Sequence, residues 1–255
     1  MKMTSLKING RTVSRLSING REVALGSKCD ALCFTAKNNQ AMLRLSQFGN
    51  PDNINLQTSF DGSSWMPYNV GDTITIPKIG GKVYFKAKGS NHRMATSPDA
   101  YHKFEFTSEF EASGNVNSLL EEDEETARTM SLEFREMCYV NLFSDTNLTT
   151  APELPATTLA FGCYAFMFHN CAYLTTAPEL PATTLADNCY YSMFSGCGNL
   201  KYVKVGFTDW NTPSATLEWL PENSGTFECS RDLINNTSER STNTVPNSWN
   251  MVAVL

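Results

Sequence analysis

Cysteine is the residue in this sequence best suited to chemistry, because a thiolate serves both as a nucleophile and as a metal ligand. The 255 residues include eight cysteines. Four of them form pairs separated by 26 residues, Cys163 with Cys189 and Cys171 with Cys197, and they stand among Tyr, Met and Phe. This setting favours a small buried apolar side chain over a nucleophile or ligand. No C-x-x-C pair occurs, so a zinc site is not expected.

Histidines and paired carboxylates are the other candidates for catalysis. The three histidines, His92, His102 and His169, belong to no hydrolase, metalloprotease or phosphate-binding motif. Glu153 and Glu179 occupy equivalent positions 26 residues apart. We therefore expect them on a solvated face rather than acting as a catalytic acid and base. A glycosidase would need a pocket with paired acids. We therefore expect that the protein is not an enzyme and that it has no catalytic residue, metal or cofactor.

Composition limits the remaining classes of function. The net charge is -6, with 20 Lys and Arg against 26 Asp and Glu, which argues against general nucleic-acid binding. No apolar run is long enough for a membrane helix. The opening MKMTSLKING lacks the apolar segment and cleavage site of a secretory signal, so we expect synthesis in the cytosol with reduced thiols.

Residues 1–28 differ in charge from the rest of the chain. They hold six cations and one acid, a net charge of +5, which leaves -11 for the other 227 residues. Ile-Asn-Gly-Arg occurs at 8–11 and again at 18–21, and Asn-Gly between apolar residues predicts a β-hairpin. One interpretation is a strand pair packed on the next domain, and the other is a docking arm for an acidic partner. The candidate attachment residues are Lys7, Ile8, Arg11, Arg15, Ile18 and Arg21.

Residues 29–112 alternate between apolar and polar side chains as short strands do. Asp61-Gly62 between two apolar stretches predicts a further hairpin. Strands at this spacing favour an immunoglobulin-like β-sandwich. Trp65 and Tyr68 are expected in its core rather than as carbohydrate-stacking residues. The predicted strands are 32–36, 54–57, 73–76, 83–87 and 101–106.

Residues 113–130 are predicted to be an acidic linker. Five consecutive acids at 121–125 are typical of a solvated, mobile connector. They lack the spaced oxygen ligands and the glycine of a calcium loop.

Residues 131–205 repeat with a period of 26. Leu148, Leu174 and Leu200 are equivalent, and one 13-residue stretch occurs unchanged at 148–160 and 174–186. Such a period predicts a solenoid whose units are stable only when stacked. Apolar positions within residues 189–197 predict a short helix in each unit, followed by an extended segment that contains two prolines.

The repeat resembles a known family. Ala-Pro-Glu-Leu-Pro-Ala-Thr-Thr-Leu-Ala, then Cys-Tyr-x-x-Met-Phe and x-x-Cys-x-x-Leu, is similar to the BspA-like leucine-rich repeat proteins of Bacteroidales and of their phages, the crAss-like group included. The region around 60–65 resembles the domain that precedes those repeats, and residues 206–255 resemble their C-terminal cap. The resemblance spans about residues 29–252. The first repeat departs from it in lacking the second cysteine.

The resemblance implies a mainly β, multidomain chain that ends in a short α/β leucine-rich-repeat solenoid and a cap. It also implies adhesion. Combined with the basic arm, it favours a phage virion protein, a capsid or tail decoration or fibre, made in the host cytoplasm. The partners expected are capsid or tail proteins, further copies of the chain, and a glycan or protein surface ligand, with no nucleic acid and no membrane. The alternative is a bacterial cell-surface adhesin whose export signal is missing.

Overall fold

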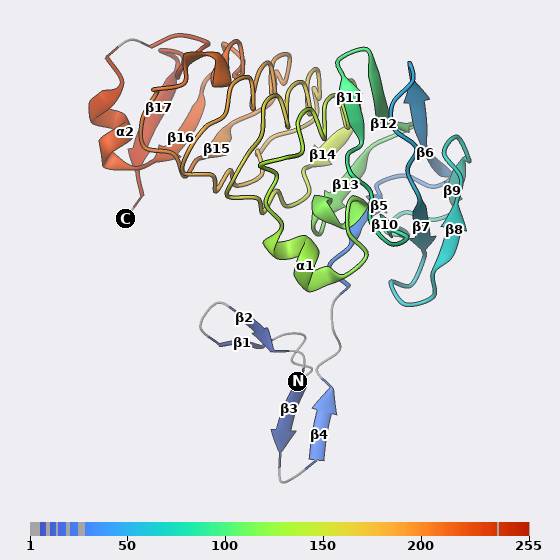
Figure 1. Ribbon diagram of the computed structural model, residues 1–255. Coiled ribbons are helices and arrows are strands. Elements are labelled where there is room, and N and C mark those ends of the chain that lie inside the picture. The colour runs from blue at the N-terminus through green and yellow to red at the C-terminus, as the bar shows by residue number, and fades with distance from the viewer. Residues whose placement is uncertain are drawn as a thin grey trace. The chain divides into compact units, whose positions relative to one another are not determined.

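The structure is a computed structural model that describes residues 29–238 and 240–254 and, before them, the backbone of four short strands (Figure 1). The chain divides into two compact units, residues 1–30 and 31–255. The protein is mainly β, and its described strands form several open sheets.

The first unit contains two antiparallel strand pairs. Strand β1 (Leu6–Ile8) pairs with β2 (Arg11–Val13), and β3 (Arg15–Ile18) pairs with β4 (Arg21–Ala24). Ile8 lies opposite Arg11 and Ile18 lies opposite Arg21. This register confirms the hairpins predicted from the two copies of Ile-Asn-Gly-Arg.

The second unit begins with two facing sheets. One has the strand order β14-β13-β5-β10-β7-β8 and the other β11-β12-β6-β9. Phe34 and Phe85 of the first sheet contact Phe104 of the second, with ring centroids 4.7 and 5.2 Å away, so the core lies between the sheets. The strands of this region are β5 (Leu32–Ala36), β6 (Ala41–Phe48), β7 (Leu56–Ser59), β8 (Met66–Tyr68), β9 (Ile74–Ile76), β10 (Lys82–Ala87), β11 (Ala95–Ser97), β12 (Ala100–Phe106) and β13 (Phe110–Ser113).

Alternating burial explains these strands. In β6, Ala41, Leu43 and Leu45 are buried, whereas Met42 and Arg44 between them are exposed. The five strands predicted from the sequence are present, two of them with later starts. The Asp61-Gly62 hairpin is confirmed, because Leu56 of β7 pairs with Tyr68 of β8. The longest strand, β6, was not predicted.

The segment expected to be an acidic linker is folded. It forms a 3-10 turn, η1 (Val116–Leu119), and a short helix, α1 (Glu124–Thr129). Val116–Leu119 are buried in the same core as the strands, and Asp123 caps α1 by accepting a hydrogen bond from the Thr126 amide. Residues 122–125 are exposed and Glu121 is partly buried, and helix α1 buries only Ala127. The expectation of a mobile connector therefore fails, since apolar side chains on either side of the acids anchor the segment.

Residues 131–205 wind into a stack of superhelical turns, each about one repeat long, which we call coils. On one side, every second backbone amide donates to the next coil, as Tyr139 does to Cys163 and Tyr164 to Cys189. The amides in between donate three residues back, as Val140 does to Met137. Equivalent side chains therefore lie above one another, and the tyrosine rings at 139 and 164 stack with centroids 5.7 Å apart.

The prediction of a short helix in each repeat is wrong. Residues 131–205, all of them described, contain linked turns instead. A residue with positive φ recurs about every four positions, at Gly162, Phe166 and Asn170 in one coil. An α-helix would direct every amide to the residue four positions back, and the coils would then lose their mutual hydrogen bonds. The apolar positions repeat every four residues rather than every 3.6, which fits the turns.

The other side of the coils is extended and continues the first sheet. Strand β14 (Leu148–Thr150) pairs in parallel with β13, so one sheet runs from the two-sheet region into the coils. Further on, β15 (Tyr202–Lys204), β16 (Gly225–Cys229) and β17 (Trp249–Ala253) form a parallel sheet. The prolines of the repeat lie outside these strands.

The C-terminal segment predicted as a cap extends the stack. Strands β16 and β17 come from it, as do η2 (Pro213–Thr216) and α2 (Arg231–Asn236). The indole of Trp219 stacks on Tyr190 at 6.0 Å and continues the aromatic column. One hydrophobic core thus runs from Leu32 to Trp249.

Candidate functional site

The residues predicted to attach the protein lie in the hairpins. Lys7 and Ile8 belong to β1, Arg11 to β2, Arg15 and Ile18 to β3, and Arg21 to β4. Their backbone pairing is given above. Their side chains fall outside the described residues, so the basic attachment surface stays a prediction.

The cysteines are buried apart from Cys29, which is partly buried. Cys171 lies within the stack, and its thiol donates to the carbonyl of Phe143 at 3.0 Å and contacts the Thr146 hydroxyl at 3.4 Å. Burial raises the pKa of Cys171 to about 11. The thiols at repeat positions therefore serve as small packing groups, as the sequence predicted, and are protonated at neutral pH.

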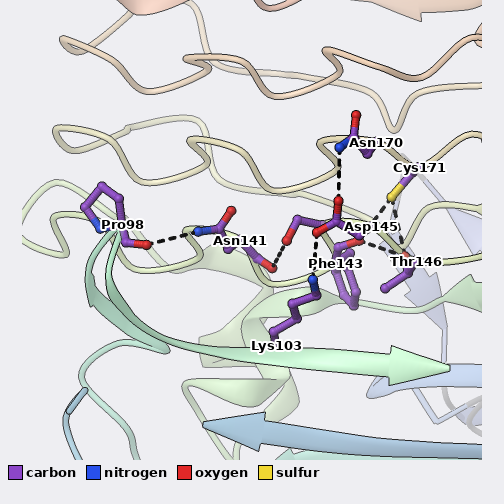
Figure 2. A network of polar contacts seen from close by, with 9 residues as sticks. Pro98, Lys103, Asn141, Phe143, Asp145, Thr146, Asn170 and Cys171 are labelled. Carbon is purple, nitrogen blue, oxygen red and sulfur yellow. Dashed lines mark hydrogen bonds and ion pairs between the residues drawn. The ribbon is translucent and has the colours of Figure 1, made fainter. Parts of the chain in front are cut away.

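A polar network joins the two-sheet region to the coils (Figure 2). Lys103 of β12 places its ammonium 2.8 Å from a carboxylate oxygen of Asp145, and the Asn170 amide in the next coil donates to the other oxygen at 3.0 Å. Burial acts to raise the pKa of Asp145, but these two hydrogen bonds, together with the charges of Lys103 and His169, outweigh it and hold the pKa below its ordinary value. Asn141 donates to the Pro98 carbonyl nearby.

The network is structural in character. The Lys103 ammonium and the Asn170 amide both bond to the Asp145 carboxylate, and the thiol of Cys171 nearby is protonated. Sequence reasoning missed it. The 25-residue spacing of Asp145 and Asn170 hints at stacking, whereas nothing in the sequence relates Lys103 to either.

The extended side of the coils carries a row of charged residues. Lys204 lies 3.0 Å from Glu179 and 3.9 Å from Glu228, and the Tyr202 hydroxyl donates to Glu228 at 2.6 Å. Glu153 lies 3.9 Å from Arg128. Glu153 and Glu179 are exposed, as predicted, and sit in ion pairs of the solvated kind.

The three histidines and the two aromatic candidates differ in burial. His102 is buried, His169 is partly buried and His92 is exposed. Tyr68 is in the core as expected. The same expectation is wrong for Trp65, which is only partly buried and lies beneath the Lys86 ammonium, 4.6 Å from the ring centre. Within residues 29–238 and 240–254, no group of three or more His, Cys, Asp or Glu side chains is placed to hold a metal ion. In the same residues no helix is long and apolar enough to cross a membrane.

No model of a known protein family, no curated protein and no solved structure matches this chain.

Proposed function

We propose that this chain is a non-enzymatic phage virion protein, a capsid or tail decoration or fibre, that attaches through residues 1–28 and displays the body formed by residues 31–255. In this proposal the two facing sheets are an immunoglobulin-like sandwich, and the stacked coils are a leucine-rich-repeat solenoid of the BspA-like kind. The similarity of the repeat to that family supports both assignments.

The observation that carries the proposal is the mechanical continuity of the body. Strand β13 pairs with β5 of the sandwich and with β14 of the coils, so a single sheet crosses from one region to the other. The hydrogen bond from Lys103 to Asp145 and the stacking of Phe104 on Phe143 reinforce the same crossing. A body held together in this way keeps its exposed faces at a fixed spacing, which suits display on a larger particle.

The division into two units supports attachment through residues 1–28, because these residues belong to a unit separate from residues 31–255. Two short hairpins bury little surface by themselves and gain stability from a partner. Six cations in 28 residues fit an acidic docking surface on a capsid or tail protein.

Mass spectrometry of purified phage particles tests this function with the full chain. We expect the protein in particles, and we expect its loss when Lys7, Arg11, Arg15 and Arg21 are all replaced by Glu. The matched control replaces four cations of the body, Lys78, Lys82, Lys88 and Arg231, by Glu and should stay in particles.

Two results would overturn the proposal in different ways. A protein found on the bacterial surface and absent from particles is the adhesin considered as the alternative. A protein found in particles irrespective of the arm substitutions attaches by some other surface.

A further inference from the structure

A cavity of about 320 Å³ opens at one end of the two facing sheets. Strands β6 and β12 of one sheet supply Gln47 and His102, which are direct partners in the strand pairing. The other sheet supplies Leu56 of β7 and Tyr68 of β8. The volume falls at the small end of the ~300–1,000 Å³ range of ligand sites, which suits a ligand of one ring.

Amide side chains dominate the polar lining. Gln47, Asn53, Asn55 and Asn69 all line the cavity and are exposed to solvent. The side-chain amides of the first three make no hydrogen bond to another described residue, whereas Asn69 donates to Asp72 at 3.0 Å. An amide offers both donors and an acceptor, which is what a hydroxyl group needs from a partner.

His102 adds an acceptor to this lining. Its ring is 1% exposed, and Nδ1 lies 2.8 Å from the Met94 carbonyl, which only accepts, so Nδ1 carries a proton. Burial lowers the pKa of His102, against the opposing effects of that carbonyl and of Asp52, and keeps the ring neutral. Nε2 is then a lone-pair acceptor on a residue that lines the cavity.

The charges around the cavity do not suit an ion. Lys88 is the one charged side chain among the lining residues. Asp52, whose charge acts on His102, is paired with Arg93 at 2.8 Å. An anion site would bring several cations together, and a purely apolar ligand would strip water from the amides without replacing their hydrogen bonds.

Apolar side chains complete the site. Ile54, Leu56 and Val70 line the cavity beside the amides. The Tyr68 hydroxyl is already used, since it accepts from the Leu45 amide and donates to the Asp72 carbonyl, so its ring contributes only an apolar edge. A ligand with hydroxyl groups and a C–H face matches this combination.

We propose that this cavity binds one hexose-sized unit of a neutral glycan, with Gln47, Asn53, Asn55 and His102 bonding its hydroxyl groups and Leu56 and Val70 contacting its C–H face. This site stands independently of the function proposed above, because it concerns the sandwich alone and requires no particle.

Nuclear magnetic resonance titration of the full chain tests the site. The probes are glucose, galactose, mannose and N-acetylglucosamine, with sialic acid and inorganic phosphate as anionic comparisons. We expect at least one neutral sugar to shift the backbone amides of residues 47, 53–56, 68–70, 88 and 102. We also expect Gln47→Ala with Asn53→Ala to weaken binding by about 10-fold, as the loss of one or two hydrogen bonds would.

Asn38→Ala is the matched control, because Asn38 is an exposed amide of the same region outside the cavity and should leave the affinity unchanged. The proposal is overturned if no neutral sugar shifts these amides at millimolar concentration, or if the shifts fall elsewhere. It is also overturned if the double variant binds like the control, or if the anions bind in preference to the neutral sugars.

Discussion

Phe104 of β12 stacks on Phe143 of the first coil, with ring centroids 5.6 Å apart and planes inclined by 13°. Phe143 stacks in turn on Phe168 at 5.4 Å, and Phe168 on Phe194 at 5.7 Å. One aromatic column therefore runs from the two facing sheets through the coils. Two regions that share a column and a sheet should unfold together.

Phe143→Ala should lower the free energy of unfolding by about 3–5 kcal/mol, because it empties a fully buried site in the middle of this column. Urea denaturation followed by circular dichroism and by tryptophan fluorescence measures the change. Phe134→Ala is the control, since that ring is 81% exposed and should change stability by less than about 0.5 kcal/mol. Two separate transitions in the unmodified protein would contradict a shared core.

Gly196→Ala should destabilise the coils by about 2 kcal/mol or more. Gly196 has φ +77°, and a Cβ there would lie 2.0 Å from Oδ1 of Asn170 in the preceding coil. Gly198→Ala is the control, because a Cβ at that position meets nothing within 4 Å and its φ is not positive. Thermal unfolding of both variants checks the pair, and equal melting temperatures would show that close stacking at Gly196 is unimportant.

Glu218→Gly should stabilise the protein by about 0.5–1 kcal/mol. Glu218 is exposed and has φ +54°, a conformation that costs an L-residue about 1–2 kcal/mol and costs glycine almost nothing. Glu222→Gly, at an exposed residue without positive φ, should instead destabilise by about 0.5–1 kcal/mol through the entropy of the unfolded chain. Chemical denaturation compares the two, and a loss of stability in both would argue against strain at Glu218.

Stability should fall as the pH rises above about 8.5, in part because of Cys171. Burial raises the pKa of this thiol to about 11 in the folded protein. Between these two pH values the unfolded chain loses the proton and the folded chain keeps it. The free energy of unfolding therefore decreases by up to about 1.4 kcal/mol per pH unit from this group.

Cys171→Ala removes that titration, so its plot of unfolding free energy against pH should be shallower between about pH 9 and 10.5. Urea denaturation across this range measures the slope. Val140→Ala, at a buried residue that does not titrate, should lower stability while keeping the original slope. A slope unchanged by the cysteine substitution would mean that the folded thiol ionises as easily as the unfolded one.

The sequence by itself determined the local pairings and the repeat. Asn-Gly and Asp-Gly between apolar residues fix tight turns whatever surrounds them, and the hairpins of β1–β2, β3–β4 and β7–β8 follow. A period of 26 residues placed Tyr164 above Tyr190 and Phe168 above Phe194, because identical units stack in register.

Only the tertiary structure decided how the backbone within each repeat is bonded and how the regions join. The apolar spacing at residues 189–197 is close to four residues, which is near enough to the 3.6 of a helix to predict one. The choice between a helix and a chain of turns depends on whether the amides bond within the coil or to the next one. Likewise, Lys103 meets Asp145 and β13 meets β14 across long stretches of sequence. Such contacts arise from packing one buried core, and no local pattern of residue types encodes them.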